Sequence, residues 1–238
     1  MIDIVECLRV LCCDLDMCTG EELKARVEQT GHKVNPLKES KTKNDVMFRS
    51  IKREIRIVGI DDCPFVPREC GTTGIVGIVF RGGYWLDGVM RTKVDIDGFN
   101  ATQKIAEMVR SSPHFKQIRV IMLDGITFAG FNVVDIRELF ESTNLSVLAL
   151  TREDPSVYDV REAIKKLPRW RERWQIIQKA GKMYTVEIGD TRLHMQIAGT
   201  SIEDAEKIVR MSCTRGNIPE PLRVAHIVAS GLAELINQ

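Results

Sequence analysis

The chain has 238 residues, of which 44% are hydrophobic and 28% charged, the composition of an ordinary globular protein with a sizeable core. Its net charge is +1, so bulk charge does not predict nucleic-acid binding, and any site for a polyanion must be a local basic patch. No apolar run reaches the length of a membrane span and the N-terminus lacks a signal-peptide layout, so we expect a cytoplasmic protein that does not enter a membrane.

The cysteines argue against a secreted disulfide framework. There are seven, an odd number, and four of them lie within the first 18 residues. Those four do not match the spacing of a zinc finger. We therefore expect reduced thiols. The four are Cys7, Cys12, Cys13 and Cys18.

Residues 1–50 differ from the rest of the chain. An apolar, Cys-rich helical pattern covers 4–15, and a polar stretch that is typical of a linker covers 35–45. Our hypothesis is that the functional protein begins at Met47, that 1–50 is an appended helical extension with a linker, and that 51–238 forms the functional domain. An intact-mass measurement of the native protein tests this hypothesis.

Three strands are predicted next, at 55–61, 73–80 and 84–94. The second is rich in Val and Ile, and Gly82-Gly83 predicts a two-residue hairpin turn between the second and third. These strands form an antiparallel meander.

Helices and strands then alternate. We expect helices at 101–109 and 133–140 and strands at 118–123 and 145–150. A charged helical region follows, in which Trp170 and Trp174 share one face and are interpreted as packing residues.

The C-terminal part begins with a short hairpin over 183–197. Ser201 is predicted to cap a helix that runs to about 211, and a final helix begins near Pro219 or Pro221. A meander followed by alternating helices and strands predicts an α/β fold with a mixed sheet, which fits a ribonuclease H-like fold with flanking helices.

Two acids stand at the ends of predicted buried strands, Asp61 after the first and Asp124 after the fourth. In a ribonuclease H-like sheet these strands are neighbours, so the two carboxylates would face each other, and hard divalent cations take oxygen ligands of this kind. The alternative is that each acid only forms a turn or caps a helix. Asp62, Asp95 and Asp97 are candidate additional ligands, although Asp62 also suits a cap and Asp97 a turn before Gly98.

Three stretches of the chain resemble an archaeal family. They are 54–62 (EIRIVGIDD), 123–132 (LDGITFAGFN) and 215–226 (RGNIPEPLRVAH). The family is endonuclease dU, formerly a family of unknown function, and the likeness runs from about 53 to 235. It is similar to endonuclease V, which nicks DNA at deaminated bases with magnesium on a ribonuclease H-like fold.

The resemblance implies roles for individual residues. Asp61 and Asp124 match the two metal-binding aspartates of endonuclease V. Arg152 stands where that enzyme has a lysine, and His226 lies on a C-terminal helix that borders its active site. The endonuclease V glutamate ligand is missing here, and Asp95 or Asp97 would substitute for it. Ile126 and Thr127 replace the histidines that follow the second aspartate.

These considerations give three sets of candidate site residues. The catalytic set is Asp61, Asp124, Arg152 and His226; the metal set is Asp61, Asp124, Asp62 and Asp97; and the nucleic-acid-binding set is Arg81, Phe128, Phe131 and Arg223. The alternatives are a surface position for Arg152, a hydrogen-bonded core position for His226, and packing roles for the aromatic residues, among them Tyr84 and Trp85.

We therefore expect a Mg²⁺- or Mn²⁺-dependent DNA endonuclease that nicks DNA at deoxyuridine or another deaminated base and serves DNA repair. One rival is a non-catalytic nucleic-acid-binding protein of the same fold. The other is a metal-dependent hydrolase of a small phosphorylated compound, which the low net charge favours. The sequence leaves the oligomeric state open.

Overall fold

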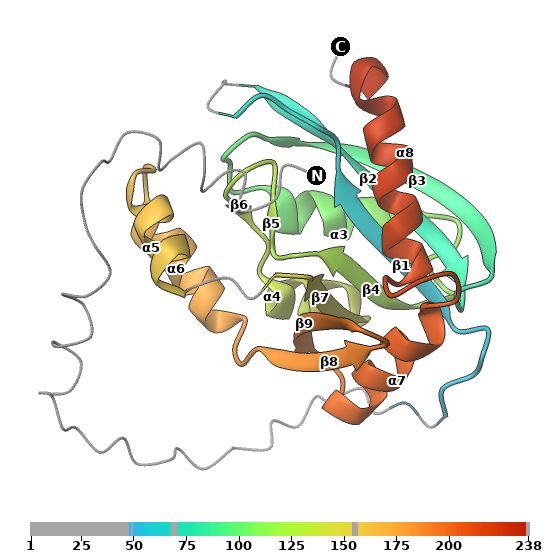
Figure 1. Cartoon of the computed structure of the whole chain (residues 1–238). Helices are drawn as coiled ribbons and strands as arrows, with labels where there is room; N and C mark the ends of the chain where they lie inside the picture. Colours follow the sequence, from blue (N-terminus) through green and yellow to red (C-terminus); the bar gives the residue numbers. More distant parts are fainter. Residues whose placement is uncertain (1–47, 49, 68–70, 154–156, 237–238) are drawn as a thin grey trace, which may run out of the picture.

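The structure is a computed structural model that describes residues 48, 50–67, 71–153 and 157–236. Its centre is a seven-stranded mixed sheet in the order β3-β2-β1-β4-β7-β9-β8, with helices on both faces (Figure 1). The mixed α/β fold is the predicted one. The prediction of a helical extension at 1–50 falls almost entirely outside the described residues, and so do the four cysteines of that segment.

The first three strands form the predicted antiparallel meander. They are β1 (Arg56–Asp62), β2 (Thr72–Arg81) and β3 (Trp85–Asp95). Arg81 pairs with Trp85, so the hairpin loop has three residues where two were expected. Gly82 takes a φ of +55° in this loop, a conformation that glycine adopts without steric cost.

The other half of the sheet is built around two parallel strands. β4 (Ile118–Asp124) lies parallel to β1, and β7 (Ser146–Thr151) lies parallel to β4. β9 (Thr191–Ala198) returns antiparallel to β7, and β8 (Tyr184–Ile188) forms the edge. The predicted adjacency of the first and fourth strands is therefore confirmed.

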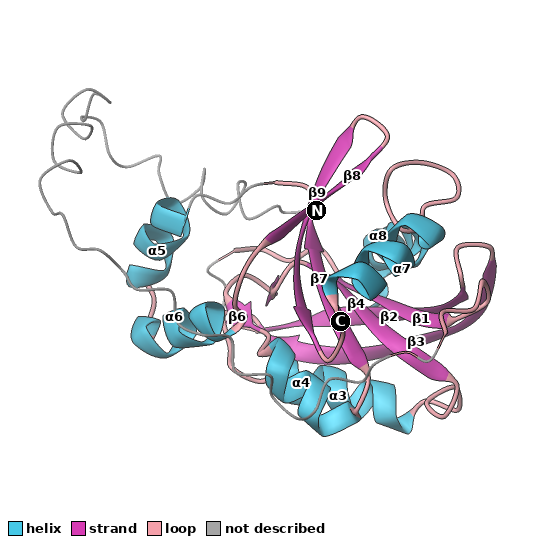
Figure 2. Cartoon of the chain, turned by 90° about the horizontal axis from the view of Figure 1, so that it is seen from below, coloured by secondary structure: helices cyan, strands magenta, loops and turns pink. Residues whose placement is uncertain are grey.

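Four helices cover the two faces of this sheet. One pair lies on one face and the other pair on the opposite face (Figure 2). The first pair is α3 (Ala101–Ser111) and α4 (Ile136–Thr143), and the second is α7 (Ile202–Ser212) and α8 (Glu220–Ile236). None of the described helices is long and apolar enough to cross a lipid bilayer.

The residues of β1 alternate between the two faces because successive side chains of a strand point in opposite directions. Val58 and Ile60 belong to the core beneath α3 and α4, whereas Ile57 belongs to the core beneath α7. Asp61 has the same parity as Ile57, and this places it on the face that α7 and α8 cover.

α4 begins at Ile136, three residues later than predicted, because a side chain caps it there. Asp135 accepts hydrogen bonds from the backbone amides of Arg137 and Glu138. The preceding residues form a two-stranded ribbon of β5 (Thr127–Phe128) and β6 (Asn132–Val133), which the sequence analysis missed. The predicted Ser201 cap of α7 is confirmed, since its hydroxyl accepts from the Asp204 amide.

The charged helical region forms two helices, α5 (Val157–Lys165) and α6 (Trp170–Lys179). They lie beside the sheet, next to β6 (Figures 1 and 2). Trp170 and Trp174 pack against the small core that these helices share with Phe131, which confirms their packing role.

Candidate metal centre

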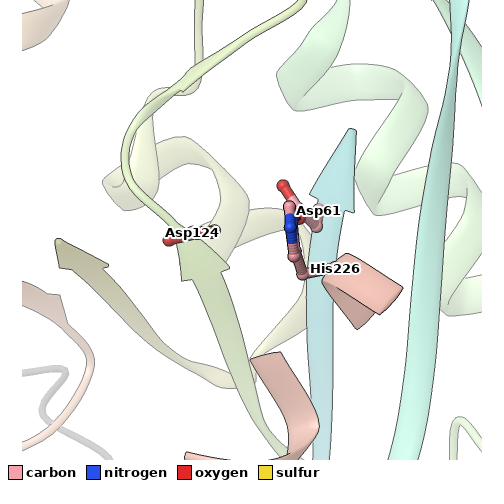
Figure 3. Close-up of side chains that lie close together, drawn as sticks. All are labelled: Asp61, Asp124 and His226. Atoms are coloured by element: carbon pink, nitrogen blue, oxygen red, sulfur yellow. Dashed lines mark hydrogen bonds and ion pairs between the residues drawn. The ribbon is translucent and has the colours of Figure 1, made fainter. Parts of the chain in front are cut away.

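Asp61 and Asp124 stand at the ends of two adjacent parallel strands. Ile60 of β1 pairs with Leu123 of β4, and each acid directly follows the residue of its own strand in this last pair. Leu123 belongs to the core on the α3–α4 face and Met122 to the core on the α7 face. Because side chains alternate, Asp124 shares the α7–α8 face with Asp61. The two carboxylates are thus brought together as predicted (Figure 3).

α8 brings a histidine to the same point. A Cβ atom added to Gly59 would lie 2.3 Å from the backbone carbonyl of Pro221, so α8 rests directly on the backbone of β1. This contact carries His226 over Asp61, and its Nδ1 atom lies 2.9 Å from a carboxylate oxygen of Asp61 (Figure 3). The hydrogen bond with Asp61 raises the pKa of His226, and partial burial of the ring opposes the shift.

Asp61, Asp124 and His226 form one candidate metal centre. Each offers a donor atom, and these atoms lie within 4.8 Å of one another. Asp61 is only 5% exposed, whereas the other two residues are half-buried and open towards solvent. Carboxylates are ligands that Mg²⁺ and Mn²⁺ take, and an imidazole suits softer transition-metal ions, so the residues fit a divalent cation.

Asp62 lies next to this group but has a different contact. Its side chain, on the opposite face from Asp61, accepts a hydrogen bond from the backbone amide of Ala129. Burial, followed by the negative charge of Asp61, raises the pKa of Asp62 to about 7. Asp62 is therefore outside the three-residue group. When it is ionised, Asp62 adds negative charge beside that group, and a bound cation relieves such crowding of carboxylates.

Asp97 does not join the metal group either. Its carboxylate accepts the backbone amide of Phe131 at 2.8 Å, and its own backbone has a left-handed φ of 50°. We therefore withdraw Asp97 as a metal ligand. Asp95 is exposed, and its backbone amide binds the side chain of Asn100.

Arg173 holds the surroundings of the site together, a role that its sequence position does not reveal. This side chain of α6 is only 2% exposed, and its guanidinium donates to the backbone carbonyls of Asp97, Gly98 and Phe131. It thereby ties α6 to the loop that follows Asp124. No sequence signal distinguished it from the other arginines of this charged region.

A cleft of about 180 Å³ opens beside Asp124 and His226. Its basic lining residues are Arg152, which follows β7 and is exposed, and Arg223 on α8. Arg223 donates two hydrogen bonds to the buried carboxylate of Glu220. Both arginines therefore line the same cleft as Asp124.

Three residues of the predicted nucleic-acid set lie elsewhere. Arg81 is at the hairpin end of β2, opposite Arg56 at the start of β1, and it pairs with Asp87. Arg81 therefore lies at the opposite end of the strands from Asp61. Phe128 is 1% exposed and Phe131 is 4% exposed, so both are packing residues and neither ring is open to a base. Tyr84 and Trp85 lie at the same distant hairpin.

Comparison with known protein families gives one match that covers most of the chain. The model of the family described as endonuclease dU matches residues 53–233. A UPF0215 protein of Methanothermobacter thermautotrophicus is 53% identical over 186 residues, which span 78% of this chain and 91% of that protein.

Solved structures show the same fold. The crystal structure of a protein of unknown function from Archaeoglobus fulgidus is 40% identical with a TM-score of 0.67, over 74% of this chain and 97% of that one. Endonuclease V from Bacillus subtilis is 11% identical with a TM-score of 0.54, over 78% of this chain and 84% of its own. A Ciona intestinalis endonuclease V in complex with an inosine-containing DNA is 15% identical with a TM-score of 0.50, over 76% and 86%.

Proposed function

Since the chain belongs to the endonuclease dU family, we propose that it is a divalent-metal-dependent endonuclease that cleaves DNA at deoxyuridine or another deaminated base. Such an activity would serve DNA repair. The observation that carries the proposal is the meeting of Asp61, Asp124 and His226 at the carboxyl ends of β1 and β4, beside an open cleft.

The two carboxylates would hold the cation, for which we propose Mg²⁺ or Mn²⁺. Asp61 and Asp124 supply oxygen ligands from rigid strands, which keeps their positions fixed. A bound divalent ion in such a site activates a water molecule and stabilises the charge that develops on a phosphodiester during hydrolysis.

His226 acts on Asp61. The hydrogen bond from its Nδ1–H to one carboxylate oxygen orients Asp61, and the backbone amide of Asp62 donates to the other oxygen. Partners of this kind fix the geometry of a metal ligand. We therefore assign His226 a positioning role.

Arg152 and Arg223 would receive the phosphate. Both line the cleft that begins at Asp124, so they lie where the backbone of a bound strand would pass. Glu220 holds the Arg223 side chain in place through two hydrogen bonds. Such contacts position a nucleic acid without reading its sequence.

A nicking assay tests the proposal. The substrates are matched duplexes that contain one deoxyuridine, one deoxyinosine or no modified base, each with Mg²⁺ or Mn²⁺. We expect a nick only in a modified strand, and loss of activity by at least about a hundredfold in Asp124→Asn. The control variant is Asp190→Asn, which removes an exposed acid at the β8–β9 turn. Equal cleavage by wild type and Asp124→Asn would refute the site, and equal cleavage of all duplexes would refute the lesion preference.

A further inference from the structure

The segment that contains α5 and α6 is strongly basic. Residues 157–182, which contain α5 and α6, hold eight Lys or Arg and three Asp or Glu, a net charge of +5. The whole chain has a net charge of only +1, so the rest of the molecule is net negative. A polyanion that approaches this protein is therefore attracted towards α5 and α6.

This segment is also joined to the part of the chain that follows Asp124. α6 adjoins β6, and β6 belongs to the segment that directly follows Asp124 (Figures 1 and 2). Arg173 of α6 donates hydrogen bonds to the carbonyls of Gly98 and Phe131, and these bonds join α6 to the segment that follows Asp124. The Phe131 ring packs in the core between α5 and α6. The charges of α5 and α6 are thus held at a fixed position relative to the acids.

Not every basic side chain of the segment is available to a ligand. Arg173 is buried, Lys165 and Arg169 pair with acids of their own helices, and Lys179 pairs with Asp135. Each of these side chains is already held by a partner within the protein.

Arg161 and Arg171 differ from these residues. Both are exposed, and neither takes part in an ion pair with another described residue. The guanidinium of Arg161 lies over the ring of Trp174 at 5.7 Å, and that of Arg171 lies over Trp170 at 4.8 Å. Stacking on an indole limits the conformations of an arginine and leaves its N–H groups directed outwards.

We propose that the exposed surface of α5 and α6, with Arg161 and Arg171 at its centre, binds the phosphate backbone of a DNA duplex. This surface would hold the duplex while the cleft beside Asp124 receives the strand that is cut. The inference deepens the proposed nuclease function and rests on it for the identity of the ligand. The contacts are to phosphates, so the surface binds DNA with and without a deaminated base.

The test is a binding measurement in EDTA, where no cleavage occurs. A fluorescein-labelled unmodified duplex is titrated with wild type and with Arg161→Gln/Arg171→Gln at several salt concentrations. Loss of two phosphate contacts is expected to weaken binding roughly tenfold and to reduce the slope of log K against log salt by about 1.8. Arg161→Lys/Arg171→Lys keeps both charges and is expected to retain most of the wild-type slope.

The matched control is Lys116→Gln/Lys207→Gln. It also removes two exposed positive charges, one in the loop before β4 and one on α7. The control is expected to bind with the wild-type slope. Equal losses in the two Gln variants would show that only net charge matters and would overturn the surface assignment, as would a wild type that does not bind the duplex.

The outcome is independent of catalysis. If the nicking assay fails while the Arg161→Gln/Arg171→Gln effect is observed, the DNA-binding surface stands and the nuclease proposal falls. If nicking succeeds and this double variant binds like wild type, the nuclease stands and the surface falls. Thermal melting of each variant verifies that it is folded.

Discussion

His226 and Asp61 are 165 positions apart in sequence, yet the Nδ1 atom of one lies 2.9 Å from a carboxylate oxygen of the other. The contact joins the C-terminal helix to the first strand. The backbones of helix and strand approach each other closely at Gly59 and Pro221. The C-terminal helix is therefore part of the site as well as part of the core.

The first prediction concerns pH. Because the hydrogen bond with Asp61 raises the pKa of His226, protonated His226 stabilises the folded, metal-free protein. This contribution is fully present below the unfolded-state value of about 6.5 and is lost as pH rises through the higher folded value. In EDTA, the difference in unfolding free energy between wild type and His226→Gln should shrink as pH increases. A difference that is constant or grows with pH would contradict the contact.

The second prediction concerns Gly59. Any side chain at this position meets the Pro221 carbonyl, which belongs to the backbone and moves only if α8 moves. Gly59→Ala should therefore lower the unfolding free energy by about 1–3 kcal/mol. Gly216→Ala is the control, since an added Cβ has no neighbour within 4 Å there. Equal stability of the two variants in urea denaturation would show that α8 is not seated on β1.

The third prediction concerns Arg173. Arg173→Met keeps most of the side-chain volume but leaves the buried carbonyl of Phe131 and the partly buried carbonyl of Gly98 without their donor. The expected cost is at least about 2 kcal/mol of unfolding free energy. Native-state hydrogen exchange should also become faster at the amides of Ala129 and Phe131. Arg171→Met, two residues earlier and exposed, should leave these amides unchanged.

The fourth prediction concerns the two described cysteines. Burial, followed by the nearby charge of Asp62, raises the pKa of Cys63 to about 11, and burial beside Glu220 raises that of Cys213 to about 12. At pH 8 fewer than about one thiol in a thousand is then a thiolate, which is the reactive form. Iodoacetamide should label both residues far more slowly in the native protein than in guanidinium, as measured on their peptides by mass spectrometry. Equal rates in the two states would contradict the burial of Cys63 and the partial burial of Cys213.

The pair of acids could be predicted because its causes are local. A buried apolar strand that ends in an acid is visible in sequence, and parallel strands place their carboxyl ends at one edge. The placement of Asp61 beside Asp124 followed once the first and fourth strands were neighbours. The position of His226 came only from the family resemblance, since nothing in a helical pattern reveals which strand the helix crosses.

The predictions that failed concern residues whose positions depend on the direction of a strand or the path of a loop. Arg81 is at the end of β2, which runs antiparallel to β1. The hairpin beside it therefore lies at the end of the sheet where β1 begins, whereas Asp61 lies where β1 ends. Phe128 and Phe131 turn inwards because the loop after Asp124 folds back, with a left-handed φ of 48° at Ala129. The Asp97 carboxylate accepts a hydrogen bond from the backbone amide of Phe131, which is 34 positions away in sequence. Such a contact cannot be predicted before the fold is known.

The most direct test of the metal centre is a calorimetric titration with Mn²⁺. Wild type and the Asp190→Asn control should bind the ion with the same affinity. Asp61→Asn and Asp124→Asn should each bind it at least about a hundredfold more weakly, because each loses a carboxylate ligand. Binding of Mn²⁺ to Asp61→Asn and Asp124→Asn with the wild-type affinity would contradict the account, because the ion would then occupy some other part of the chain.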